Sequence, residues 1–217
     1  MKITDIEAQK RRKNRYNIYI DDEFAFGLDE EVVMTCSLSI GMELTDSFIE
    51  EIIKKEEYKK AYNYAIRLLA FRSRSEKEIR DKMKLKGYEE QIINKTIELL
   101  YDDNYLNDLE FGRSLIRDKQ NFNGAGKNLL KNELYKKGLN KELINELIEE
   151  NVSYEDEYKR ALELAEKKNS KFSSKDDKNK KYRQLSGLLS RKGYSFDIIS
   201  KVVKKVINNE GEFDDYD

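Results

Sequence analysis

The stretch RSRSEKEIRDKMKLKGY, residues 72–88, decides the fold because it contains both ends of one short helix. Ser75 and Glu78 have the spacing of a capping box, in which two side chains satisfy free N–H groups at a helix start. Gly87 lacks a Cβ atom and can take the left-handed conformation that ends a helix. The stretch therefore predicts a helix that begins after Ser75 and ends before Gly87.

The same pattern occurs three times, aligned on Lys86-Gly87, Lys137-Gly138 and Lys192-Gly193. Apolar residues stand eight and four positions before each glycine, and five, six and ten positions after it. These residues are Ile79, Met83, Ile92, Ile93 and Ile97, then Leu130, Leu134, Leu143, Ile144 and Ile148, then Leu185, Leu189, Ile198, Ile199 and Val203. A further helical segment precedes each pair, so we predict three helices in each repeat.

The N-terminal residues have a different periodicity. Tyr16, Ile18 and Ile20 alternate with polar residues before Asp21-Asp22, and a second alternating run follows them. Aspartate tolerates positive φ better than most residues do, so the pair is acceptable as a turn. The segment predicts a β-hairpin. A helix is then expected from Thr45 or Asp46, either of which can cap it.

These patterns predict a mainly α fold, with tandem three-helix repeats in an elongated, curved arrangement after a small N-terminal β-hairpin element. Asn107 with Glu110 resembles a capping box less closely than Ser75 with Glu78 does, so Asn107 and Asp108 are expected to precede the next helix as a structural motif. The segment from Lys167 to Lys181 is charged and is predicted to be an exposed flexible loop. The expected divisions are 1–57 for the N-terminal extension, 58–108, 109–153 and 154–208 for the repeats, and 209–217 for an acidic, frayed tail.

The composition excludes several kinds of chemistry. The chain has no histidine and Cys36 is its only cysteine, so histidine-based catalysis and the usual Cys and His zinc sites are excluded within one copy. Gly124–Asn128 resembles a phosphate loop but lacks its first glycine and its Ser or Thr, so we expect it to open a helix. No stretch approaches the roughly 20 apolar residues that span a bilayer. We expect a cytoplasmic protein with no catalytic residues, metal or cofactor.

Basic residues gather around the middle helix of each repeat. Residues 59–86 contain ten basic and three acidic residues, whereas residues 1–57 contain eight basic and fourteen acidic residues. Lys86, Lys137 and Lys192 complement a helix dipole, so a structural role is favoured for them. The other cations are candidates for contact with a partner or with nucleic acid. They are Arg67, Arg72, Arg74, Lys77, Arg80, Lys127, Lys131, Lys181 and Arg183.

The run from Arg72 to Ile79, then Lys86-Gly87-Tyr88, then Tyr105 to Asp108, resembles the signature of bacterial RecX proteins. The resemblance continues through Lys137-Gly138 and through Gly193, and the opening β segment is similar to the extension of longer, Gram-positive RecX proteins. It implies a monomeric, non-enzymatic regulator that binds the RecA filament, and single-stranded DNA through that filament. It also implies modulation, chiefly inhibition, of filament assembly, ATP hydrolysis and strand exchange.

Three alternatives remain open from the sequence. The first, the runner-up, is a helical-repeat protein that binds DNA without RecA through the same basic blocks. A scaffold for another acidic protein is the second alternative. A carboxylate-metal nuclease is the third, although the pairs Asp21-Asp22 and Asp102-Asp103 are better explained as turns.

Overall fold

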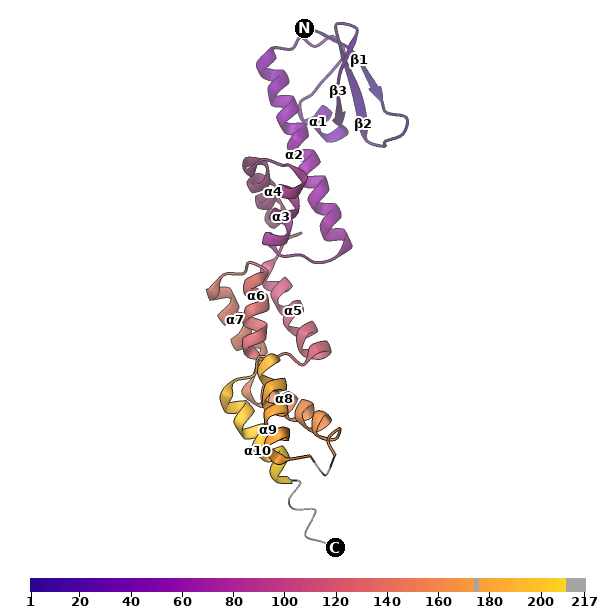
Figure 1. Cartoon of the computed structure of the whole chain (residues 1–217). Coiled ribbons are helices and arrows are strands. Elements are labelled where there is room, and N and C mark those ends of the chain that lie inside the picture. Colours follow the sequence, from indigo (N-terminus) through magenta and orange to yellow (C-terminus); the bar gives the residue numbers. More distant parts are fainter. Residues whose placement is uncertain (174–175, 210–217) are drawn as a thin grey trace. The chain divides into compact units, whose positions relative to one another are not determined.

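The computed structural model describes residues 1–173 and 176–209 and divides into two compact units (Figure 1). Unit 1 consists of Met1–Arg74 and Ile79–Leu106, and unit 2 consists of Ser75–Glu78 and the chain from Asn107 onward. The described residues form three strands and ten helices. The fold is therefore mainly helical with a small N-terminal sheet, as predicted.

Unit 1 begins with an antiparallel sheet in the order β1-β2-β3, made of Ile3–Ala8, Arg15–Ile20 and Glu23–Asp29. Asp21 and Asp22 connect β2 to β3 with φ angles of 49° and 68°, which confirms the predicted hairpin and its turn. Strand β1 was not predicted.

Strand β1 was missed because its alternation of apolar and polar residues is broken. The register of β1 against β2 shifts between Ile3 and Asp5. Such a bulge changes which residues share a face of the sheet. Ile3 and Ile6, three positions apart, consequently both pack in the core beneath the sheet, so the two-residue period of a regular strand is hidden.

Helix α1 (Glu30–Thr35) and the first half of α2 (Asp46–Phe71) cover this sheet (Figure 1). Thr45 caps α2 as predicted, because its side chain accepts the N–H of Phe48 at 3.3 Å. Helix α2 continues without a break through residues 57 and 58, where a division was expected. Ile52 packs in the core of the extension, whereas Ala61 and Ala65 pack in the core of the first repeat.

The second half of α2 forms the first repeat with α3 (Glu76–Lys86) and α4 (Glu90–Asp102). Ile79 and Met83 of α3 are fully buried, and the apolar run of α4 completes the same core. This confirms the predicted apolar stripe on both sides of Gly87.

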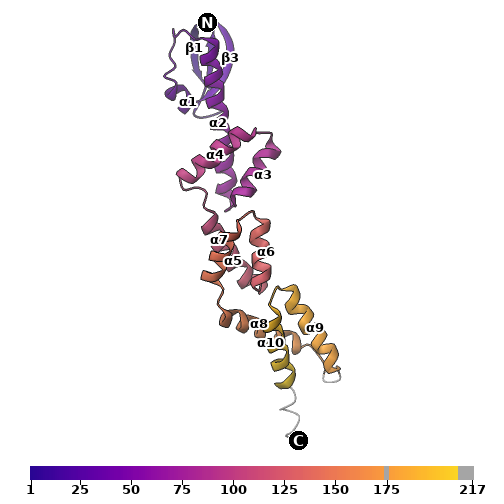
Figure 2. The ribbon, with the colours of Figure 1, turned by 90° about the vertical axis from the view of Figure 1, so that its left-hand side faces the viewer.

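Unit 2 contains the second and third repeats (Figure 2). The second consists of α5 (Asp108–Asn123), α6 (Lys127–Lys136) and α7 (Lys141–Asn151). The third consists of α8 (Tyr154–Asn169), α9 (Lys178–Arg191) and α10 (Phe196–Asn209). Each repeat has its own core built on the predicted apolar positions.

The predicted flexible loop in the third repeat is shorter than expected. Helix α8 extends through Asn169 and α9 begins at Lys178, so both ends of the segment 167–181 are helical. The backbone N–H of Lys180 is capped by the side chain of Asp177 at 3.3 Å, which explains the early start of α9. The predicted acidic tail, 209–217, lies outside the described residues from position 210 onward.

Candidate partner-binding site

The candidate cations at the end of α2 lie in unit 1 and differ in how they are held. Arg74 is partly buried and donates from Nε to the carbonyl oxygen of Leu68 at 3.1 Å, near the C-terminal end of α2. Arg67 and Arg72 are exposed, and Arg72 donates from Nη1 to the carbonyl oxygen of Ser73 at 2.8 Å. Arg74 therefore supports the local backbone, whereas Arg67 and Arg72 place their charge on the surface.

Arg80 is held by helix α4 of the same repeat. Its Nη1 donates to Asn94 Oδ1 at 2.6 Å and lies 3.6 Å from a carboxylate oxygen of Glu90. The charge of Arg80 is thus partly compensated within unit 1.

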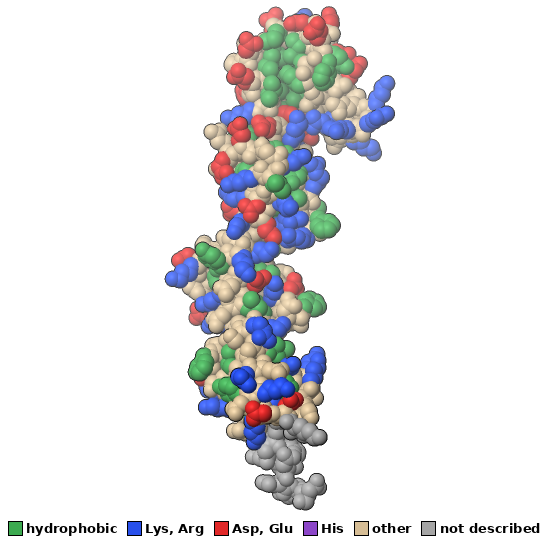
Figure 3. All heavy atoms as spheres, viewed as in Figure 1, with side chains coloured by type: hydrophobic (Ala, Val, Ile, Leu, Met, Phe, Trp, Pro, Cys, Tyr) green, Lys and Arg blue, Asp and Glu red, His purple; other side chains and the backbone are tan. Residues whose placement is uncertain are grey.

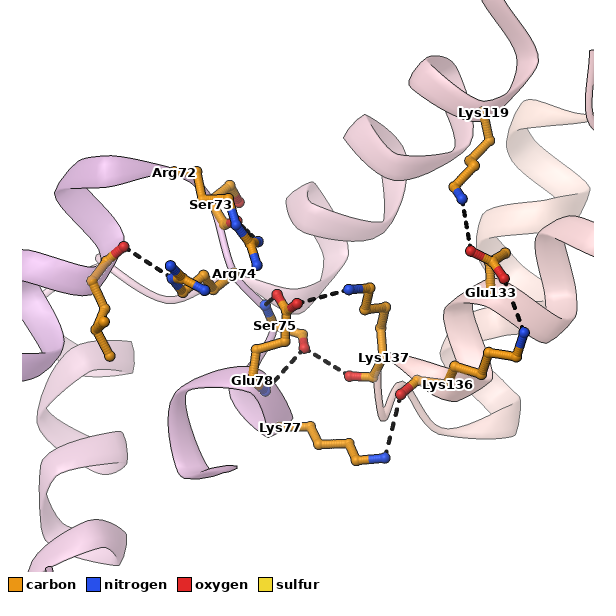
Figure 4. Close-up of polar contacts among 11 residues, drawn as sticks. Arg72, Ser73, Arg74, Ser75, Lys77, Glu78, Lys119, Glu133, Lys136 and Lys137 are labelled. Atoms are coloured by element: carbon orange, nitrogen blue, oxygen red, sulfur yellow. Dashed lines mark hydrogen bonds and ion pairs between the residues drawn. The ribbon is translucent and has the colours of Figure 1, made fainter. Parts of the chain in front are cut away.

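Ser75 and Glu78 form the predicted capping box at the start of α3 (Figure 4). Glu78 N–H donates to Ser75 Oγ at 3.3 Å, and Ser75 N–H donates to Glu78 Oε2 at 3.4 Å. The same two residues also hold Lys137. Ser75 Oγ donates to the carbonyl oxygen of Lys137 at 2.7 Å, and Lys137 Nζ lies 2.7 Å from Glu78 Oε1. The capping box consequently joins two distant parts of the chain.

Two further contacts complete this packing. Lys77 Nζ donates to the carbonyl oxygen of Lys136 at 3.3 Å, and Glu76 N–H donates to Asp108 Oδ1 at 2.8 Å. Burial raises the pKa of Asp108, although the hydrogen bond from Glu76 opposes this. Lys77, a candidate for partner contact, therefore lies against the Lys-Gly turn of the second repeat.

We call this arrangement a turn contact: the Lys-Gly turn of one repeat packs on the start of the middle helix before it. A second turn contact joins the last two repeats. Gly126 N–H donates to the carbonyl oxygen of Lys192 at 2.8 Å, and Asn128 N–H donates to that of Gly193 at 3.0 Å. Lys192 Nζ donates to the carbonyl oxygen of Asn123 at 2.6 Å. Lys137 and Lys192 thus hold neighbouring repeats together, a role different from the helix-dipole interaction expected for them.

Buried side chains seal the second turn contact. Lys127 N–H donates to Glu157 Oε1 at 2.7 Å, and Glu157 is 4% exposed. Tyr194 donates from its hydroxyl to the carbonyl oxygen of Gly124 at 3.0 Å, and burial raises the pKa of Tyr194 to about 12. Gly126 is the N-cap of α6, so the glycine-rich segment opens this helix as predicted.

The remaining candidates lie in unit 2 in different surroundings. Lys127 and Arg183 are exposed, and Lys131 donates from Nζ to Asn145 Oδ1 at 3.2 Å. Lys181 was expected on the surface, but it is only 6% exposed, so its charge is not presented to a partner. The reason is the early start of α9, which places Lys181 one turn from Leu185 on the buried face.

Two groups of cations escaped the sequence reasoning. Four consecutive basic residues, 10–13, occupy the connection between β1 and β2 and are all exposed; blue side chains project from this part of unit 1 in Figure 3. The uninterrupted run of four basic residues could have indicated this group in the sequence. It was overlooked because residues 1–57 as a whole contain more acidic than basic residues. The second group, Lys168, Lys180 and Arg191, surrounds Arg183 in the third repeat.

The described residues contain no group of three or more His, Cys, Asp or Glu side chains that could hold a metal ion. Among the helices of the described segments, none is long and apolar enough to cross a membrane. Burial and ion pairing thus divide the predicted cations into structural residues and exposed ones.

Four family models match the chain in sequence. The regulatory protein RecX N-terminal domain matches residues 1–45, and the first, second and third three-helix domains of RecX match residues 61–100, 107–148 and 155–203. The matches follow the sheet and the three repeats described above.

Relatives named Regulatory protein RecX are similar to the chain over most of its length. The protein from Clostridioides difficile (strain 630) is 37% identical, with 99% of this chain and 98% of the relative covered. The one from Bacillus subtilis (strain 168) is also 37% identical, over 94% and 76%. A crystal structure of regulatory protein RecX matches with a TM-score of 0.80 at 27% identity, covering 93% of this chain and 98% of that one. RecX from Lactobacillus salivarius matches with a TM-score of 0.65 at 26% identity, over 70% and 97%. The chain belongs to the RecX family of regulatory proteins.

Proposed function

We propose that this chain regulates the RecA recombinase by binding the RecA filament on single-stranded DNA. It would inhibit filament assembly, ATP hydrolysis and strand exchange. Membership of the RecX family over the N-terminal domain and all three repeats carries this proposal. The chain would act by binding alone, in keeping with the name of its relatives, regulatory proteins.

The exposed cations of unit 1 support the proposed mode of binding. Arg67 and Arg72 lie at the end of α2 with their side chains on the surface. Arginine binds carboxylates and phosphates through a planar fork of donors, so such a surface suits an acidic protein face or a DNA backbone. We therefore assign the first contact with the filament to this end of α2.

The test uses preformed RecA filaments on single-stranded DNA, with ATP hydrolysis and filament length followed together. We expect the wild-type chain to inhibit hydrolysis. The double variant Arg67→Glu/Arg72→Glu should require about tenfold more protein for the same inhibition, which corresponds to ~1.4 kcal/mol of binding free energy. Arg74 and Arg80 stay unchanged because their partners support the fold.

A matched control is Lys54→Glu/Lys204→Glu, which reverses two exposed cations elsewhere and makes the same change in net charge. It should inhibit as the wild type does. Full inhibition by the Arg67 and Arg72 variant would remove the proposed binding face, and a wild-type chain without effect on hydrolysis or filament length would refute the function itself. Circular dichroism checks that both variants remain helical.

The second candidate function is DNA binding that acts without RecA. The exposed basic run 10–13 favours it. Salt-dependent binding to single strands that is equally tight with and without RecA would support this function instead.

A further inference from the structure

The third repeat contains a pocket whose described charged lining residues are all basic. It has a volume of about 540 Å³ and lies between α8 and α9. Its described lining residues are Lys168, Lys180, Arg183, Gln184, Leu188 and Arg191. Four of these six side chains carry a positive charge and none carries a negative one. Such a lining suits an anionic ligand.

The pocket follows one face of α9. Lys180, Gln184, Leu188 and Arg191 succeed one another at intervals of three or four residues, and Arg183 is followed at intervals of four by Gly187 and Arg191, which places these residues on one face of the helix. A Cβ atom at Gly187 would meet only Arg191 Nη1, at 3.3 Å. A glycine inside a helix costs stability, by about 1 kcal/mol relative to alanine.

The position equivalent to Arg183 takes part in a turn contact in the other two repeats. The residue ten positions before each turn glycine is Lys77 in the first repeat, Asn128 in the second and Arg183 in the third. Lys77 contacts Lys136, and Asn128 donates to Gly193, so both are used in turn contacts. No fourth turn packs on α9 in the described chain, and Arg183 is exposed. Within the described residues, the start of α9 thus has no turn contact with another repeat.

The charges of the pocket are unevenly compensated. Lys180 Nζ lies 2.7 Å from Asp176 Oδ1, and Lys168 Nζ lies over the ring of Phe172 at 5.3 Å from its centroid. Arg183 and Arg191 have no ion pair with any residue of the described segments. Among the described residues, no carboxylate therefore compensates the charge of these two arginines, and their guanidinium groups can donate to an anionic ligand.

We propose that this pocket is a phosphate-binding site that holds the sugar-phosphate backbone of single-stranded DNA. Arg183 and Arg191, eight residues apart on one helix face, would each donate to a phosphate group, and Lys168 and Lys180 would add attraction. A second copy of this chain is a poorer occupant, because its uncovered turn at Gly87 is flanked by Lys84 and Lys86. The site rests on the proposed function for its biological meaning, but its binding to DNA is measured without RecA.

The experiment measures fluorescence anisotropy of a labelled oligothymidylate with the full chain in the absence of RecA. We expect Arg183→Glu/Arg191→Glu to weaken binding at least tenfold at low salt. Losing two phosphate contacts should also reduce the slope of log K against log salt by about 1.4. An oligonucleotide of the same length without bases should bind the wild-type chain to within about threefold of oligothymidylate, since the phosphates are the ligand.

The matched control is Arg117→Glu/Lys204→Glu, two exposed cations of unit 2 outside the pocket. The fold-loss of affinity of this control should be less than a third of the fold-loss of the pocket variant. Equal losses in both variants would reduce the site to general electrostatic attraction and overturn the proposal. So would competition by polyglutamate as strong as that by unlabelled oligothymidylate, which would indicate an acidic protein ligand. Arg183→Gln/Arg191→Gln, a milder change, repeats the test if circular dichroism shows that the charge reversals unfold the chain. If the glutamine variant binds as tightly as the wild type, the proposal is overturned. If the pocket variant still inhibits RecA, the proposed function stands independently of the pocket.

Discussion

Ser75 Oγ donates a hydrogen bond of 2.7 Å to the backbone carbonyl oxygen of Lys137, which lies 62 residues further along the chain. Ser75 is fully buried, and the same oxygen accepts the N–H of Glu78. A single hydroxyl thereby caps α3 and fixes the turn that ends α6. This double use makes Ser75 a sensitive position for the stability of unit 2.

Ser75→Ala should lower the free energy of unfolding by about 2 kcal/mol. Removing a serine cap costs about 1 kcal/mol, and the Lys137 carbonyl loses its donor in a buried position, which adds a similar amount. Urea denaturation followed by circular dichroism measures the change. Ser73→Ala, two residues earlier and exposed, is the control and should change stability by less than about 0.5 kcal/mol. Equal stability of both variants would show that the hydrogen bond to Lys137 is dispensable.

The three turn glycines should respond to alanine in a graded order. Gly87 has φ +92° and open space around a Cβ atom. Gly87→Ala should therefore lower the free energy of unfolding by about 1–2 kcal/mol, the cost of the left-handed conformation alone. At Gly138 a Cβ atom would lie 2.5 Å from Lys77 Cβ, and at Gly193 it would lie 2.3 Å from the backbone nitrogen of Leu129. Gly193→Ala should therefore cost the most, because its clash is shorter and involves the backbone nitrogen and Cα of Leu129, whereas the clash at Gly138 is with side-chain atoms of Lys77. Thermal unfolding of the three variants tests this order, and an equal loss at all three glycines would contradict the turn contacts.

Asp108→Asn should not weaken the fold at pH 7. Burial raises the pKa of Asp108, so the protonated form is favoured more in the folded chain than in the unfolded one, whose value is 3.8. The stabilisation from this group is complete below the unfolded pKa and is lost as the pH rises through the folded pKa. Asparagine keeps an oxygen for the Glu76 N–H without the buried charge. Urea titrations should show that the free energy of unfolding of the variant rises relative to that of the wild type between pH 4 and pH 7. A fall in this difference over the same range would show that the charge itself stabilises α3.

Gly187→Ala should raise the stability of the third repeat by about 0.5–1 kcal/mol. The position is in the interior of α9, where alanine is a better helix former, and the new methyl group meets only the flexible end of Arg191. The melting temperature of the variant should rise. Gly126→Ala is the contrasting control, because a Cβ atom there would lie 2.8 Å from the backbone of Gly193 and should destabilise the chain. A fall in melting temperature for Gly187→Ala would mean that α9 needs the glycine for packing.

Much of the fold was readable in the sequence because its signals are local. The capping box, the positive φ of Asp21 and Asp22, and the left-handed Gly138 each depend on a few neighbouring residues. The apolar positions around the turn glycines follow the helical period, and they form the cores of all three repeats. Strand β1 escaped because its bulge breaks the two-residue period.

The use of each charged side chain was decided by the tertiary structure. Lys77, Lys137 and Glu157 meet partners 30 to 62 residues away, and no local pattern encodes such distances. The burial of Lys181 and the open pocket at Arg183 likewise depend on where α9 begins and on which helices pack beside it. Local chemistry specifies where helices start and stop. Only packing determines whether a cation forms contacts within the fold or remains exposed to a ligand, because the interaction energy of its charge depends on neighbours from elsewhere in the chain.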